Sequence, residues 1–418
     1  MAKKSRKQKR RSTTSSLSKG VALLAGCTVG GFSAHGLVPE DLFSISAGPV
    51  VLHPRVIMGE AYSDNVTRGD GKIIPRRSDW VTVIAPSVEA RLGHPGGVLQ
   101  ADVTYTARSL FYADQSELNA VDHTLSGHIT YAGARIRSST SGSVNFASSV
   151  FSGWERFLYD IYLRRIKKRN RTIYNVSERV DYDITAKSDL YGFGRVRGND
   201  YESGTSYGDR LDWEVGGGFG YSVTPKHQLF GEAAYRRESL TPNLPWRQSP
   251  PDLEIVRTSV GLSGELTPKI HGTVRVGYEF AQYENGASAP DSPSASISLT
   301  WQPRDRTKIS ASFSRSTTAS VSWSRTSYVN NYVTITVSQI VGVQHPIALQ
   351  LQGRYGINEY SGGRHRTSEY WDITLSAIYR IYVWWGVGAQ YEYEKRSGTG
   401  WWNDYDAHQI FISSVFGF

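Results

Sequence analysis

The C-terminal segment of the chain is an alternating strand that ends on an aromatic carboxylate. One face of residues 408–418 carries large apolar side chains and a single serine, in the order Ile410, Ile412, Ser414, Phe416 and Phe418. The opposite face includes Gln409, Ser413 and Gly417. Because successive side chains of a strand point to opposite sides, this segment suits a wall with lipid on one side and water on the other. The alternative is the buried last strand of a soluble β-sandwich.

Alternating segments of the same kind recur along the chain. No stretch after residue 36 has the roughly eighteen uninterrupted apolar residues of a membrane helix. Segments 274–280, 347–355, 371–380 and 383–394 each have one apolar face with aromatic residues toward its ends. The polar faces of these segments and of the strand around residue 236 supply six candidate lumen residues: Arg236, Arg275, Glu279, Arg354, Glu392 and Glu394. A soluble sandwich also alternates, but its core face is rarely so rich in terminal Trp and Tyr. We therefore predict an all-β chain that crosses a membrane as an antiparallel up-and-down barrel.

The spacing of turns predicts about eighteen strands. Short turns are expected at residues 94–97, 132–134, 184–187, 223–226, 266–269, 302–304, 341–343 and 380–381. Longer polar segments alternate with them, at residues 63–78, 113–119, 151–170, 199–209, 240–251, 284–291, 317–329, 360–367 and 395–404. This arrangement puts both ends of the barrel on the short-turn side, which is periplasmic in bacterial barrels, and the longer loops outside.

The N-terminal region has the order of a secretory signal. Of a formal net charge of +9, eight cations without an acid lie before residue 20, so the remaining chain is nearly neutral and its charge indicates no nucleic-acid partner. An apolar stretch, residues 21–32, and small residues follow. We predict a signal peptide over residues 1–36, a short periplasmic segment over 37–47 and a barrel over 48–418. The alternative for the basic start is a nucleic-acid-binding arm.

Two cleavage sites are open. The segment Leu24-Ala25-Gly26-Cys27 resembles the lipobox of bacterial lipoproteins, which would make Cys27 a lipidation site. Cleavage after Gly36 would instead discard Cys27 with the signal. Because Cys27 is the only cysteine, the chain can form no intramolecular disulfide and no cysteine metal cluster.

The opening strand and the turns carry a family resemblance. Residues 48–65 contain prolines and end in the aromatic-x-Asp-Asn motif Tyr62-Ser63-Asp64-Asn65, and similar turns recur at 182–187 and 221–226. On these features the chain resembles the putative β-barrel porin 2 family of Gram-negative outer-membrane proteins over residues 48–418, and Phe416 and Phe418 are a closing-strand signal that resembles outer-membrane barrels in general. The association of that family with exopolysaccharide production implies an export role.

Catalytic patterns are weak in this sequence. Gly261-Leu262-Ser263-Gly264 lacks the last glycine of a nucleophile elbow, and residues 216–220 lack the helix that a phosphate-binding loop requires. Asp404, Asp406 and His408 alternate and could bind a cation, but we interpret them as polar lumen or rim residues. We predict no catalytic residue, no cofactor and no metal site.

The densest charge is a run of six cations between residues 163 and 171: Arg164, Arg165, Lys167, Lys168, Arg169 and Arg171. Two hypotheses fit this run. Either it lies on the outer rim and pairs with phosphates of the surface lipid, or its loop folds into the lumen and sets a positive field for anionic solutes or an acidic polysaccharide. The aromatic residues Trp154, Phe157, Tyr159 and Tyr162 precede it and could hold the loop against a wall.

These features predict an outer-membrane channel that passes polar solutes or a nascent exopolysaccharide without chemistry on the cargo. The alternatives are a barrel enzyme that modifies surface lipid and a structural or adhesive barrel closed by its loops. Expected partners are outer-membrane lipid and lipopolysaccharide, the barrel assembly machinery and periplasmic polysaccharide-export components, with no nucleic acid.

Overall fold

The computed structural model describes residues 44–94, 96–150, 152, 155, 168–202, 208–242, 250–286, 289–320, 327–342, 346–361, 366–399 and 404–417. The predicted signal peptide, Cys27, Arg164, Arg165, Lys167 and Phe418 lie outside these residues. No helix in the described ranges is long and apolar enough to cross a membrane.

Strands account for most of the described chain. Their bounds are β1 Ile45–Ala47, β2 Val50–Ser63, β3 Asp79–Leu92, β4 Leu99–Tyr112, β5 Ala120–Ala132, β6 Ile136–Ala147, β7 Arg171–Asp183, β8 Ser188–Tyr201, β9 Gly208–Thr224, β10 His227–Pro242, β11 Leu253–Thr267, β12 Ile270–Tyr283, β13 Ser292–Arg304, β14 Thr307–Ala319, β15 Ser327–Val341, β16 Ile347–Tyr360, β17 Arg366–Tyr382, β18 Trp385–Gly398 and β19 Tyr405–Phe416. The described residues also include loops and one 3-10 turn, η1 (Ser116–Leu118).

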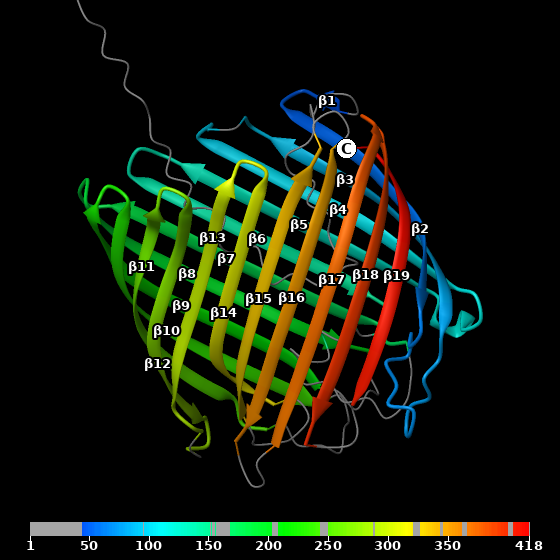
Figure 1. The fold of residues 1–418 in the computed structure, drawn as a ribbon. Helices are drawn as coiled ribbons and strands as arrows, with labels where there is room; N and C mark the ends of the chain where they lie inside the picture. Colours follow the sequence, from blue (N-terminus) through cyan, green and yellow to red (C-terminus); the bar gives the residue numbers. More distant parts are fainter. Residues whose placement is uncertain are drawn as a thin grey trace, which may run out of the picture.

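The strands close into a barrel (Figure 1). From β2 to β19, each strand pairs antiparallel with the next, and β19 pairs with β2 from Gln409↔Ser63 to Phe416↔Val56. The short strand β1 pairs only with β2, so the ring itself has eighteen strands. The prediction of an all-β, up-and-down barrel of about eighteen strands is confirmed.

The turns and loops segregate to opposite ends of the barrel, as the sequence predicted (Figure 1). Two short turns lie further along the chain than expected, at residues 305–306 and 383–384. Each of the two preceding strands contains a register shift, between Trp301 and Arg304 and between Arg380 and Tyr382. Because a bulge lets pairing resume beyond an irregular residue, these strands extend past the sites where the sequence indicated a turn.

The two faces of the wall differ as predicted. On β19, Ile410 and Ile412 are 50% and 63% exposed on the outer surface, the positions that lipid would cover. Their neighbours Phe411 and Val415 face inward and are buried. The interior is therefore apolar in places, and Phe411 belongs to an inner cluster with Val66, Val81 and other residues near the loop end.

Candidate functional site

The candidate functional site is the inner wall of the barrel. The six predicted lumen residues all alternate with outward-facing apolar residues, as Arg275 and Glu279 do with the exposed Val276, Tyr278 and Phe280 on β12. Glu279, Arg236 and Glu394 are buried, whereas Arg275, Arg354 and Glu392 are half-buried. The alternation places them inside the barrel, although this does not test their role.

A chain of ion pairs crosses the inner face of β8 to β12. Arg195 lies 3.6 Å from Glu214, which also binds Arg257 at 2.6 Å. Glu232 then links Arg257, at 3.4 Å, to Arg275, at 3.2 Å. These distances join five side chains from five neighbouring strands into one network.

The glycine-rich segment of β9 makes room for this network. Gly218 is paired with both Tyr191 and Glu232, and a Cβ at Gly218 would collide with the Tyr191 hydroxyl. With that space free, the hydroxyl of Tyr191 donates a hydrogen bond to Glu232 at 3.2 Å, and the guanidinium of Arg179 lies 3.8 Å from the Tyr191 ring centroid. The glycines at residues 216–220 are therefore strand residues, and Gly218 leaves room for large neighbouring side chains.

Near the loop end, β14 separates from β13 while it stays paired with β15, and its end lies against the inner wall. Pairing of β13 with β14 stops at Ala295↔Arg315, and the backbone beyond it bonds to side chains of β10 and β12. Glu279 accepts the backbone N–H of Thr317 at 2.7 Å, and Glu238 accepts that of Ala319 at 2.8 Å. Glu279, which the sequence predicted as a lumen residue, and Glu238, which it did not single out, thus hold the end of β14 within the lumen.

The loop that connects β2 to β3, residues 64–78, also folds inward. Arg68 lies 2.6 Å from Glu394 on the inner face of β18, and Asn65, Val66 and Ile74 are almost fully buried. The sequence predicted an outer loop here, one of nine, and suggested an inward fold only for the loop that carries the cation run. Its Asp-Asn motif was the available signal, because Asn65 organises the loop.

Asn65 uses its whole amide within this loop. Its Nδ2 donates to the carbonyls of Gly69, at 3.0 Å, and Asp406, at 2.8 Å. Its Oδ1 accepts the N–H of Gly69 at 2.9 Å and the hydroxyl of Thr67 at 3.1 Å. One buried side chain therefore fixes the loop to itself and to β19.

Two of the three residues that the sequence offered as a weak cation site, Asp406 and His408, lie at the seam where β19 pairs with β2. Asp64, rather than Asp404, completes the group, and the three residues offer ligand atoms within 4.8 Å of one another. However, Arg76 binds Asp406 at 2.8 Å and Asp64 at 3.2 Å, so both carboxylates already pair with a guanidinium. This arrangement fits polar rim residues, the interpretation that the sequence favoured.

A second acidic group lies in the lumen beneath loop 64–78. Asp372, Glu392 and Glu394 approach within 4.8 Å of one another. Arg354 binds Asp372 at 2.9 Å, and Arg68 binds Glu394. Two arginines thus balance most of this charge, and we assign no metal to it.

Only part of the predicted cation run lies in the described residues. Arg171 begins β7 and is buried, with Glu155 at 2.9 Å and the carbonyl of Ser149 at 2.6 Å as partners. Lys168 is exposed, and its Nζ donates to the carbonyl of Asn119 in the neighbouring loop at 2.7 Å. Arg171 is therefore a charge-compensated structural residue, and whether the rest of the run faces the rim or the lumen stays a prediction.

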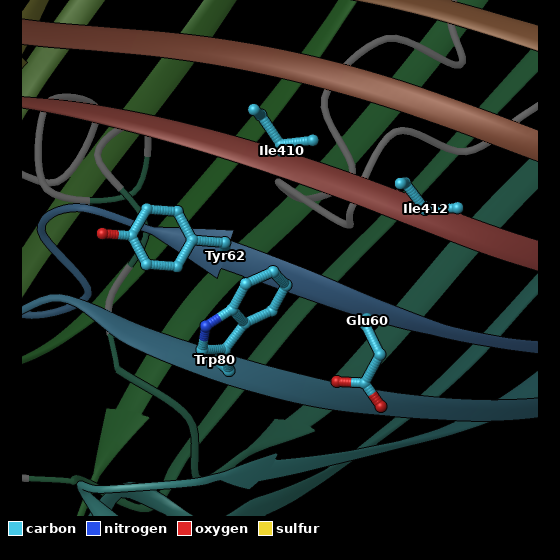
Figure 2. A pocket seen from close by; sticks show the side chains of 5 residues that line it. All are labelled: Glu60, Tyr62, Trp80, Ile410 and Ile412. Carbon is cyan, nitrogen blue, oxygen red and sulfur yellow. The ribbon is translucent and has the colours of Figure 1, made fainter.

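The outer face of the seam carries an apolar hollow (Figure 2). The hollow is lined by Glu60, Tyr62, Trp80, Ile410 and Ile412, on strands β2, β3 and β19. Since these residues share the lipid-facing side of the wall, the hollow lies outside the solute path. The rings of Tyr62 and Trp80 are 5.2 Å apart near the loop end of the barrel, where aromatic residues form an interfacial girdle.

A closed antiparallel barrel with an apolar outer surface and a charged inner wall defines a porin-type transmembrane protein of the bacterial outer membrane. Residues 206–417, just over half of the chain, match the model of the putative beta-barrel porin 2 family, and the protein belongs to that family. The resemblance seen in residues 48–65 is consistent with this, although the match itself begins at residue 206. A comparison with curated proteins gives no significant match.

Solved structures of similar architecture are remote in sequence. OpdO of Pseudomonas aeruginosa is 12% identical with a TM-score of 0.44, and the alignment covers 88% of this chain and 97% of that one. OccAB3 of Acinetobacter baumannii is 11% identical with a TM-score of 0.41, covering 88% and 99%. The siderophore receptor PirA of P. aeruginosa is 7% identical with a TM-score of 0.41, covering 90% and 81%. At these values the similarity carries no argument about cargo.

Proposed function

We propose that this porin-type barrel passes polar solutes across the outer membrane and performs no chemistry on them. The observation that carries the proposal is the ion-pair network on the inner wall of β8 to β12. Charged side chains placed on a surface that lines a barrel are hydrated on their open side, and a ring of eighteen strands is wide enough for an aqueous channel. Family membership supports the same function.

A glycan strand is a second candidate cargo. The inner faces of β13 and β14 carry a succession of hydroxyl groups, among them Ser294, Ser296, Ser298, Ser310 and Ser312. Hydroxyl-lined walls and arginine–aromatic pairs such as Arg179 and Tyr191 can bind sugar hydroxyls and ring faces. Passage of a nascent exopolysaccharide would require export components at the periplasmic mouth and lipopolysaccharide around the wall, and these remain proposed partners.

The barrel-enzyme alternative has little support in the described strands. Ser263 of the elbow-like segment is buried on the inner face of β11. The chain then continues into another strand, because β11 ends at Thr267 and β12 begins at Ile270. A nucleophile elbow would need a helix at that point. The fold and the family favour a channel.

Single-channel conductance of the refolded protein in a planar bilayer tests the proposal. We expect stable conductance steps in KCl and swelling of proteoliposomes in neutral sugars, with smaller rates for larger oligosaccharides. A well-folded barrel, identified by heat-modifiable migration, that is silent in both assays would contradict the channel and favour a structural barrel closed by its loops. A change in an added lipid substrate would favour the enzyme.

A further inference from the structure

The network on β8 to β12 is asymmetric in exposure. In each pair the carboxylate is buried and the arginine is the more exposed partner. The side chains of Arg195, Arg197 and Arg275 are 33%, 32% and 29% exposed, and that of Arg257 is 18% exposed. Their partners Glu214, Asp212 and Glu232 are 3% exposed or less. We call the four arginines the arginine stripe.

The stripe is continuous across the inner wall. Arg195 and Arg197 are two positions apart on β8, so their side chains lie on the same face of the strand. Arg197 binds Asp212 at 2.6 Å. Glu214 and Glu232 connect Arg195 to Arg257 and Arg275 on β11 and β12. Because Arg195 and Arg257 share Glu214, and Arg257 and Arg275 share Glu232, these guanidinium groups lie close together on one surface.

A solute in the lumen meets the two signs of charge unequally. The buried carboxylates hold the arginines in place, but they lie behind them, whereas the guanidinium groups reach the open side. The stripe has four guanidinium groups over three carboxylates, so its charge does not cancel completely. Coulomb interaction falls with distance, and the nearer positive groups therefore dominate the field at the surface.

We propose that the arginine stripe is a binding path for anionic solutes, whose carboxylate, phosphate or acidic-sugar oxygens pair with the exposed guanidinium groups. Guanidinium offers several N–H donors in one plane and matches such oxyanions with two parallel hydrogen bonds. This inference rests on the proposed channel function and names its substrate class. It assigns the anion preference to strands of the barrel wall, whereas the sequence suggested the loop that carries the cation run.

Ion selectivity measures the stripe directly. The reversal potential in a KCl gradient should show anion preference for the wild type. Replacing two stripe arginines (R195Q/R275Q) should lower the anion-to-cation permeability ratio about threefold, which Coulomb attraction across several ångströms of water can supply. The Lys variant R195K/R275K should retain the preference, because the charge stays.

Two further variants test whether the change in ion selectivity comes from the charge of the stripe. Arg237 and Arg315 lie on the outward-facing parity of β10 and β14, so R237Q/R315Q removes as many arginines without touching the stripe. It should leave the permeability ratio unchanged. Glu232→Gln removes a buried carboxylate and should increase the anion preference. Equal effects of the stripe and control pairs, or a decrease with Glu232→Gln, would overturn the proposal.

A binding measurement separates the stripe from the channel. Calorimetric titration of inorganic pyrophosphate into the detergent-solubilised full chain requires no conduction. We expect binding in the wild type and R237Q/R315Q and about tenfold weaker binding in R195Q/R275Q, a loss of the size of a charge-assisted contact. A barrel that does not conduct but shows this difference would contradict the proposed channel and retain the stripe. A conducting barrel with no selectivity or binding difference would retain the channel and reject the stripe.

Discussion

Replacement of Asn65 by alanine should open the inward-folded loop between β2 and β3. The substitution removes four hydrogen bonds: two donated to the carbonyls of Gly69 and Asp406 and two accepted from Gly69 and Thr67. At about 0.5–1 kcal/mol net for each bond, loop opening should become easier by roughly 2–4 kcal/mol. That change corresponds to an increase of about 30- to 900-fold in the fraction of open loop.

Hydrogen exchange of the loop amides measures this opening. The N–H groups of Val66 and Gly71 bond to Arg77 and Ile74 within the loop, so both should exchange faster by that factor. Asn358→Ala is a matched control, since Asn358 is equally buried on β16 and lies outside the loop. If Asn65→Ala left these amides as protected as in the wild type, or if Asn358→Ala had the same effect, the assigned role of Asn65 would be wrong.

Three further predictions concern the same end of the barrel. Arg68 pairs with Glu394 and has a positive φ of 48°, a conformation that glycine adopts more easily than alanine. Arg68→Ala should therefore favour the open loop more than Arg68→Gly does, by about 1 kcal/mol. Equal exchange rates of the loop amides in the two variants would contradict this. Burial opposes ionisation of Asp70, but the N–H groups of Ile74 and its two preceding residues outweigh it and hold the pKa of Asp70 below its usual value. The Asp70 carboxylate should therefore stabilise the loop above about pH 4, roughly its pKa in the unfolded chain, and this stabilisation should be lost as pH falls through the lower pKa of the folded state. The hydrogen-exchange protection of the Ile74 amide should fall over this pH range in the wild type and not in Asp70→Asn. Glu60→Leu on the lipid face, near the strand end, should change the free energy of unfolding in lipid vesicles by less than about 1 kcal/mol, and a larger gain would place Glu60 deeper in the bilayer.

The strands and their faces could be predicted because their information is local. In β19 and β18, the period of two assigns each side chain to lipid or lumen without knowledge of any partner. The turns could also be predicted from local Gly, Pro and Thr-x-Lys patterns. Two bulges displaced turn positions by two or three residues, since a bulge leaves little trace in the alternation.

The inward-folded segments could not be predicted in this way. Loop 64–78 has no periodicity, and Arg68 finds its partner Glu394 at a separation of 326 residues. The dense cation run indicated that the loop before Arg171 could fold inward, but Arg171 itself is neutralised by its ion pair with Glu155. The arginine stripe is distributed over three strands at alternate positions. Its significance lies in the unequal exposure of its pairs, which only the packed structure reveals.

The seam between β2 and β19 has a consequence for the order of assembly. Asp64 accepts the backbone N–H of His408 at 2.7 Å, and Asn65 donates to Asp406, so loop 64–78 is attached to both the first and the last strand of the ring. These contacts join residues 344 and 341 positions apart. Such distant contacts form late, after intervening strands have brought the ends together. The loop can therefore take its inward position only when the ring has closed, and a nascent barrel with an open seam would present a wider interior than the finished one.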